Sequence, residues 1–182
     1  MNFLNNNHGP KDEATQYATA PYFCHVFIEN MADLHQLSFL LTADHNKAEE
    51  CFVAGLDDCL NTNHVFREWA HAWAKRTIIQ NAISGLQPHP GHASSSPAGR
   101  SESWQTTSLG DLEFYRVLAL EDFERFVFVM SFLEHYSEHD CALLLGCSLQ
   151  DIRKGRVRAL EQLAFTSHRL SDSTPELQET NR

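Results

Sequence analysis

Basic residues gather near the C-terminal end of an otherwise acidic chain. The 182-residue sequence has a formal net charge of −10, yet basic residues outnumber acidic ones between positions 149 and 169. Arginine and lysine can neutralise phosphates, and together with glutamine they can donate hydrogen bonds to base edges. The candidate nucleic-acid contacts are Ser148, Gln150, Arg153, Lys154, Arg158 and Arg169. The overall negative charge argues against non-specific binding to a polyanion but allows a local footprint of this kind.

A second chemical pattern, H-x-x-E-H, overlaps the start of this segment. His135, Glu138 and His139 follow the order found in inverted zinc peptidases. That chemistry needs both histidines on one face of a continuous helix, whereas Ser137 is better interpreted as a cap between two helices. A zinc peptidase therefore stays as a remote alternative, and we expect no metal and no cofactor.

No other catalytic arrangement is present in the sequence. It contains no P-loop, no G-x-G-x-x-G and no G-x-S-x-G motif. The five cysteines include no C-x-x-C pair, so we interpret them as small core residues. The acidic pairs Glu49–Glu50 and Asp57–Asp58 are typical of solvated helix faces. We therefore expect a protein that is not an enzyme.

Apolar periodicity predicts the elements that position these residues, beginning with three helices in residues 17–86. One long helix is followed by a second that Asp44 caps, and a third begins after residues 61–63 and ends near Gly85 and Pro88. The predicted apolar faces are, in order, Phe23, Phe27, Met31, Leu34, Leu37 and Leu41; Ala48, Cys51, Phe52, Leu56 and Cys59; and Phe66, Trp69, Trp73 and Thr77, broadened by Ile78, Ile79 and Ile83.

The remaining sequence predicts a linker and a second helical domain. Residues 87–108 are rich in Pro, Gly and Ser and lack periodicity, which is typical of a flexible linker. Helical patterns return in 109–170, while the polar ends, 1–16 and 171–182, predict disordered tails. The first two helices of this domain are predicted from Leu112, Tyr115, Leu118 and Ala119, and from Phe123, Phe126, Val127, Met130 and Leu133. The expected fold is all-α, with two small helical domains joined by a flexible linker.

A tight turn is predicted between the last two helices. Ser137 stands three residues before Asp140, as in a capping box, and Ala142 is small enough for a close helix crossing. Gly146 tolerates the positive φ of a turn, and Ser148 can cap the next helix. In that helix Ile152, Ala159, Leu160 and Leu163 are predicted to face the core. Short helix, glycine turn and longer basic helix is the order of a DNA-binding helix-turn-helix; an ordinary hairpin with a solvated basic face is the alternative.

At these residues the chain resembles bacterial RNA polymerase sigma factors of the sigma-70 family, specifically the two-domain extracytoplasmic-function type. Leu120 and Arg125 resemble the family's helix before the helix-turn-helix. Tyr136, Ser137, Ala142, Leu145, Gly146, Ile152, Arg158, Ala159 and Leu163 fall in its register. Residues 41–50 resemble the start of the helix that docks on the polymerase clamp, and residues 73–81 the helix that reads and melts the downstream promoter element.

The resemblance implies a transcription initiation factor that binds core RNA polymerase and double-stranded promoter DNA. It places polymerase contacts at Glu49, Glu50, Asp57 and Asp58, and downstream promoter contacts at Trp69, Trp73, Lys75, Arg76 and Asn81. An anti-sigma protein is a further partner that it allows. The polar N-terminus without signal-peptide order and the lack of a membrane-length apolar run predict a cytoplasmic protein with no membrane association.

Several positions depart from the family pattern. Val53, Ala54 and Gly55 stand where the family has a polar clamp face, and Gly155 and Arg156 replace an arginine and an apolar residue in the recognition helix. These departures keep open a second hypothesis: a degenerate sigma-like regulator that acts through protein contacts without full initiation activity.

Overall fold

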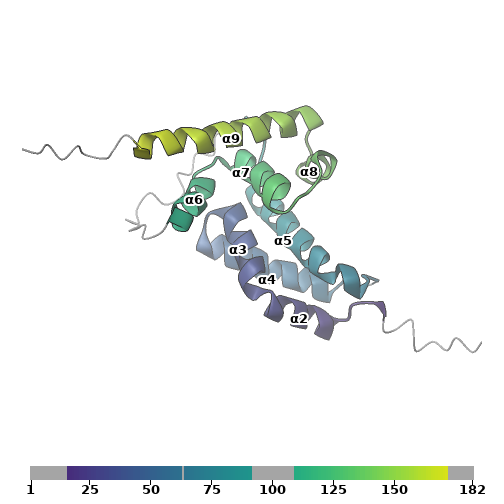
Figure 1. Ribbon diagram of the computed structural model, residues 1–182. Helices are drawn as coiled ribbons and strands as arrows, with labels where there is room; N and C mark the ends of the chain where they lie inside the picture. Colours follow the sequence, from purple (N-terminus) through teal and green to yellow (C-terminus); the bar gives the residue numbers. More distant parts are fainter. Residues whose placement is uncertain (1–15, 63, 92–108, 172–182) are drawn as a thin grey trace, which may run out of the picture. The chain divides into compact units, whose positions relative to one another are not determined.

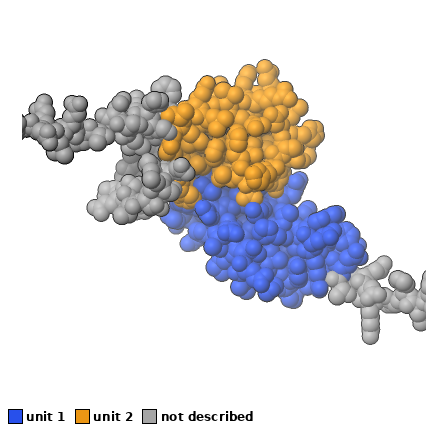
Figure 2. Space-filling model, viewed as in Figure 1, with its two compact units in different colours: residues 1–85 blue, residues 86–182 orange. Residues whose placement is uncertain are grey.

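All regular elements are helical in the residues that the computed structural model describes, 16–62, 64–91 and 109–171. The all-α prediction is therefore confirmed. The chain separates into two compact units, residues 1–85 and 86–182 (Figure 2). Residues 1–15, 92–108 and 172–182, which contain most of the predicted tails and linker, lie outside this description.

Helices α2 to α5 form unit 1 and helices α6 to α9 form unit 2 (Figure 1). Their bounds are α2 Ala20–Glu29, α3 Met31–Thr42, α4 His45–Leu60, α5 Ala70–Leu86, α6 Leu109–Leu118, α7 Asp122–Phe128, α8 Glu138–Leu145 and α9 Leu149–Ser171. A 3₁₀ turn, Arg67–Trp69, precedes α5, and a π-helical turn, Val129–Leu133, follows α7. No helix in the described ranges is long and apolar enough to cross a membrane.

The predicted long first helix is wrong, because the chain breaks at Asn30 into α2 and α3. The Asn30 side chain donates to the Val26 carbonyl over 2.8 Å, and its backbone leaves the helical region at φ −112°. Asparagine offers the backbone such local alternatives to a continuous helix. Met31 is consequently 53% exposed, whereas Phe27 and Leu34 remain in the core.

Helix α4 is capped as the sequence predicts and crosses α5 closely. The Asp44 carboxylate accepts from the Lys47 amide over 3.0 Å at the start of α4. At the crossing the Thr77 hydroxyl bonds to the Gly55 carbonyl over 3.2 Å. A Cβ on Gly55 would lie only 2.7 Å from Ile78 Cγ1, so this crossing requires glycine.

The face of α5 that packs in the core matches the prediction in part, because Thr77, Ile78 and Ile79 are buried as expected. Small and β-branched side chains fill it: Ala70, Ala74, Thr77, Ile78, Ile79 and Ala82. Trp69 is 58% exposed and ends the 3₁₀ turn, and Trp73 is half-buried. The buried face of α5 thus consists of alanine, threonine and isoleucine, and the two predicted tryptophans do not belong to it.

The segment before α2 pairs with the segment before α5. The Ala18 amide donates to the Val65 carbonyl over 2.7 Å, and the Tyr17 and Phe66 rings stack with centroids 4.8 Å apart. Arg67 Nε also donates to the Tyr17 carbonyl over 3.3 Å. These contacts join the segment before α2 to the segment that leads into α5, about 50 positions later in the sequence.

In unit 2, helix α9 packs against α6, α7 and α8. The fully or nearly fully buried residues include Phe123, Phe126, Val127, Met130, Ile152 and Ala159. Leu160 was expected in the core but is 47% exposed, and Leu133, part of the pattern that predicts the second helix, is 44% exposed. Gly155 packs closely against α7, since a Cβ there would lie 2.9 Å from Phe123 Cε1.

Arg125 is a buried cation that holds the loop before α7. Its side chain is 3% exposed and pairs with Asp122, and its Nη1 donates to the Leu120 carbonyl over 2.9 Å. Leu120 and Arg125, five positions apart in the sequence, are therefore joined by a direct hydrogen bond. The paired carboxylate and carbonyl compensate for much of the cost of burying the guanidinium.

The cysteines follow the core interpretation in part. Cys51, Cys59 and Cys141 are buried, whereas Cys24 is exposed. Burial raises the pKa of the three buried thiols, so they remain protonated and act as small apolar residues.

Candidate nucleic-acid interface

Two capped helices and a short turn build the candidate interface. Ser137 caps α8, where its hydroxyl accepts from the Asp140 amide over 3.1 Å. Gly146 ends α8 in the left-handed region at φ 61°. Ser148 opens α9 through a reciprocal pair with Asp151, whose amide donates to the Ser148 hydroxyl and whose carboxylate accepts from the Ser148 amide, each over 3.2 Å. Because such caps are local, they fix the turn between the helices without distant contacts.

The outward side of α9 carries most of the predicted DNA-contacting residues. Gln150, Arg153, Lys154, Val157, Arg158 and Glu161 line one shallow groove along the helix. The side chains of Arg153 and Arg158 are 67% and 52% exposed. Ser148 is exposed, but its hydroxyl donates to Asp151 over 2.6 Å. Arg169 belongs to α9, but its side chain lies outside the described part of the chain.

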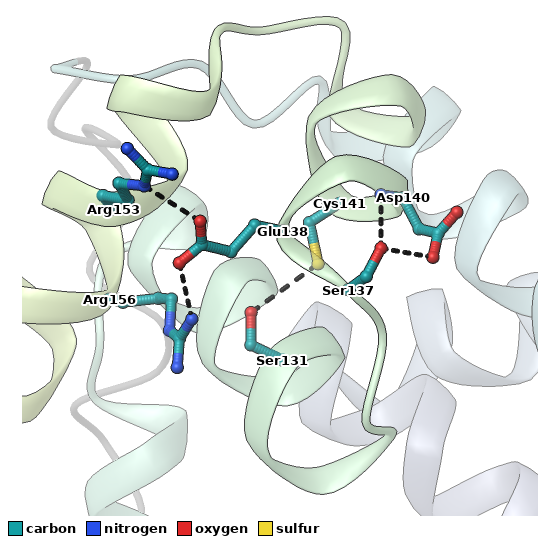
Figure 3. A network of polar contacts seen from close by, with 7 residues as sticks. All are labelled: Ser131, Ser137, Glu138, Asp140, Cys141, Arg153 and Arg156. Carbon is teal, nitrogen blue, oxygen red and sulfur yellow. Dashed lines mark hydrogen bonds and ion pairs between the residues drawn. The ribbon is translucent and has the colours of Figure 1, made fainter.

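Glu138, at the first position of α8, joins α8 to α9. Its Oε2 accepts from Arg153 Nε and its Oε1 accepts from Arg156 Nη1, both over 2.9 Å. Figure 3 shows the carboxylate lying between the two arginines. The hydrogen bond from Arg153, followed by the charges of both arginines, holds the pKa of the Glu138 carboxyl below its ordinary value.

Arg156 faces this network instead of the core. Its guanidinium lies over the Phe132 ring, 4.9 Å from the centroid, and its side chain is 34% exposed. The helix buries Ile152, Gly155 and Ala159 on its inner side. Glycine takes the inner position at residue 155, and the neighbouring Arg156 lies at the surface of unit 2. There its guanidinium donates to Glu138 and covers the Phe132 ring.

Arg158 has a buried acidic partner. Its Nη1 lies 3.5 Å from Glu124 Oε1, and the Glu124 side chain is only 3% exposed. The sequence did not predict that Glu124 and Glu138 pair with arginines of α9, because each lies on a different helix from the arginine that it contacts. The ion pairs of Glu124 with Arg158 and of Glu138 with Arg153 reduce the net positive charge of the basic face of α9.

The candidate residues of unit 1 are only partly brought together. Asn81 Nδ2 donates to Asp58 Oδ2 over 2.7 Å, which joins one predicted promoter residue to one predicted polymerase residue. Lys75 and Arg76 are half-buried on α5. Glu49, Glu50 and Asp57 are exposed along α4. The acidic side chains on α4 therefore remain accessible, whereas Asn81 is occupied within the unit.

Of the three unusual residues on α4, only Val53 makes the surface apolar. It is 63% exposed, Ala54 is half-buried, and Gly55 is buried against α5. Nearby, Ile28, Met31 and Phe52 line a hollow at the junction of α2, α3 and α4. Unit 1 thus offers an apolar surface in addition to its acidic one.

The H-x-x-E-H residues do not share one continuous helix. His135 lies before the Ser137 cap with φ 57°, whereas Glu138 and His139 lie in α8. Glu138 is engaged by two arginines, and the described residues contain no cluster of three or more His, Cys, Asp or Glu side chains suited to a metal. This geometry does not provide the zinc-peptidase arrangement, because that chemistry requires both imidazoles on one helix face.

Comparison with known protein families gives no matching family model, and no curated protein matches the chain significantly. The function is therefore inferred from the chain's own residues.

Proposed function

We propose that the chain is a sigma-like transcription initiation factor that binds core RNA polymerase and directs it to promoter DNA through α8 and α9. The observation that carries this proposal is the arrangement of α9 after the Gly146 turn. Its first turns expose Gln150, Arg153 and Lys154 in one groove, and a recognition helix presents its N-terminal residues to the major groove in this way.

Local order supports the same function. Ser148 and Asp151 fix the first turn of α9, and Ala142 and Ile152 are buried where α8 and α9 meet. Gln150, Arg153 and Lys154 are thus held on rigid elements, as a base-reading site requires. On this proposal, unit 2 reads the upstream promoter element, while α5 of unit 1 contacts the downstream element.

A salt-titrated binding isotherm on a duplex selected from a randomised pool tests DNA recognition. Lys154→Ala should weaken binding, by about 1–3 kcal/mol if Lys154 contacts a base. Arg158→Ala should instead weaken binding to all duplexes alike and reduce the salt slope by about 1 if it contacts phosphate. Lys47→Ala removes a positive charge from exposed Lys47 on α4 and serves as the control.

Circular dichroism must show that each variant remains folded, because Arg158 also balances the buried Glu124. If the folded Lys154 and Arg158 variants bind like the wild type, the groove is only a solvated basic face and the proposal of DNA recognition fails.

Co-purification with core RNA polymerase tests the proposed binding to that enzyme. The acidic residues Glu49 and Glu50 are exposed on α4, and the double reversal Glu49→Lys/Glu50→Lys should reduce retention of the full chain. Asp33→Lys, on the exposed side of α3, is the control. Absence of wild-type retention at low salt would refute polymerase binding.

A degenerate regulator acting through protein contacts is the second candidate. The exposed Val53 and the hollow lined by Ile28, Met31 and Phe52 favour it, because exposed apolar patches commonly mark protein-binding surfaces. DNA binding without polymerase retention would select this candidate over an initiation factor.

A further inference from the structure

The contact between Glu138 and Arg153 restricts how that arginine can meet DNA. Glu138 Oε2 accepts from Arg153 Nε over 2.9 Å (Figure 3). The Arg153 side chain is 67% exposed and the Glu138 side chain 31%. The carboxylate is therefore the more enclosed partner, and the guanidinium is the group that reaches outward from unit 2.

A second arginine holds Glu138 in this position. Arg156 Nη1 donates to the other carboxylate oxygen over 2.9 Å, and its own guanidinium stacks on Phe132. Both oxygens are thus occupied by α9, at positions three residues apart on the helix. The negative charge also lies in the first turn of α8, where the helix dipole stabilises it.

Guanidinium stereochemistry then leaves one bidentate edge of Arg153 available. The group is planar and donates five hydrogen bonds in a fixed geometry. With Nε bonded to Glu138, a side-on pair through Nε is blocked, and the remaining pair is formed by the two terminal nitrogens. That pair matches the O6 and N7 acceptors of guanine in the major groove.

We propose that Glu138 is a positioning residue that presents Arg153 end-on to a guanine and so sets the base preference at one position of the DNA site. This inference rests on the DNA-binding function proposed above. A paired Arg153 attracts phosphate less strongly than a free arginine, so its contribution is to discrimination between bases.

Parallel selection from a randomised duplex pool tests the role of Glu138. The proteins compared are the full-length wild type, Arg153→Ala, Glu138→Gln and Glu161→Gln. Glutamine has nearly the size of glutamate, but it carries no charge and places an NH2 donor where one of the two acceptor oxygens faces an arginine. Glu161→Gln is the matched control, because Glu161 lines the same groove and forms no ion pair among the described residues.

The wild type should prefer guanine at one position. Arg153→Ala should lose about 5- to 150-fold of that preference, which corresponds to the 1–3 kcal/mol typical of a bidentate base contact. Glu138→Gln should lose about threefold or more at the same position, comparable to breaking an exposed ion pair. Glu161→Gln should keep the preference. Thermal melting monitors folding, and a change of preference at a single position is not expected from lower stability alone.

Three results would overturn the inference while leaving DNA binding intact. The first is an unchanged guanine preference in folded Glu138→Gln, and the second is an equal loss in Glu161→Gln, which would indicate a general effect of charge. A position that depends on Arg153 but prefers another base would also overturn it. If the wild type selects no sequence at all, the proposed function itself fails.

Discussion

Replacing Gly55 by alanine tests the close crossing of α4 and α5. The added Cβ would lie 2.7 Å from Ile78 Cγ1, 3.2 Å from the Ile78 amide nitrogen and 3.4 Å from its Cα. Ordinary carbon–carbon contacts lie at about 3.5–4.0 Å. Ile78 is fully buried, so rotating its side chain relieves only part of the overlap and the two helices must separate.

The expected magnitude follows from two opposing terms. Alanine is better than glycine in a helix by about 1 kcal/mol, while overpacking a core costs about 1–3 kcal/mol. Because backbone atoms of Ile78 take part in the overlap, we use the upper value of the overpacking cost, about 3 kcal/mol. Gly55→Ala should therefore lower the free energy of unfolding of unit 1 by about 2 kcal/mol.

Gly85→Ala is the matched control in the same unit. Gly85 lies in α5, and a Cβ there would meet nothing within 4 Å. This variant should raise stability by up to about 1 kcal/mol, so the two glycine substitutions should have opposite signs.

Urea unfolding followed by tryptophan fluorescence measures both variants. A Trp104→Phe background leaves Trp69 and Trp73, which belong to unit 1. With m near 2 kcal/mol/M, Gly55→Ala should lower the midpoint by about 1 M. If both variants are stabilised equally, the crossing does not require glycine and the packing argument is wrong.

Three further predictions concern unit 2. Ser148→Ala removes the cap of α9 and should cost about 1 kcal/mol of unfolding free energy, measured by urea midpoint. Arg125→Met leaves the Leu120 carbonyl without its buried donor and should cost about 2–3 kcal/mol in the same assay. The pKa of the Asp151 carboxyl is lowered, chiefly by its hydrogen bonds with Ser148. The ionised carboxylate therefore stabilises the fold above the ordinary carboxyl pKa of about 4, and this stabilisation is lost as pH falls through the lower pKa of the folded state. Acid titration of unfolding should therefore be shallower in Ser148→Ala than in wild type; identical slopes would contradict this coupling.

Local features of the fold could be predicted from the sequence. Asp44 and Ser137 cap helices because each acts on an amide three residues later. Such contacts depend on neighbouring positions alone. The break at Asn30 was not predicted, because the apolar residues on either side continue at helical spacing. That spacing carries no information about the hydrogen bond from the Asn30 side chain to the Val26 carbonyl.

Packing and pairing between helices could not be predicted in the same way. Trp69 matches the apolar period of its segment, but it ends the 3₁₀ turn before α5 and is 58% exposed. At the candidate interface the exposed basic groove on α9 follows from charge and period, whereas its acidic partners Glu124 and Glu138 are supplied by other helices. Their contacts depend on tertiary geometry that a single sequence does not encode locally.

The pairing of Ala18 with Val65 has a consequence for how unit 1 exchanges its amide hydrogens. Most helical contacts are local and can open one turn at a time, but this bond joins positions far apart in sequence. Ala18 is buried, and stacking of Tyr17 on Phe66 covers the same junction. Breaking the bond thus requires separating the first segment of the unit from the entry to α5. The Ala18 amide should consequently exchange with the cooperative opening of the whole unit, although it precedes α2 and amides at the edges of helices usually exchange through local fraying.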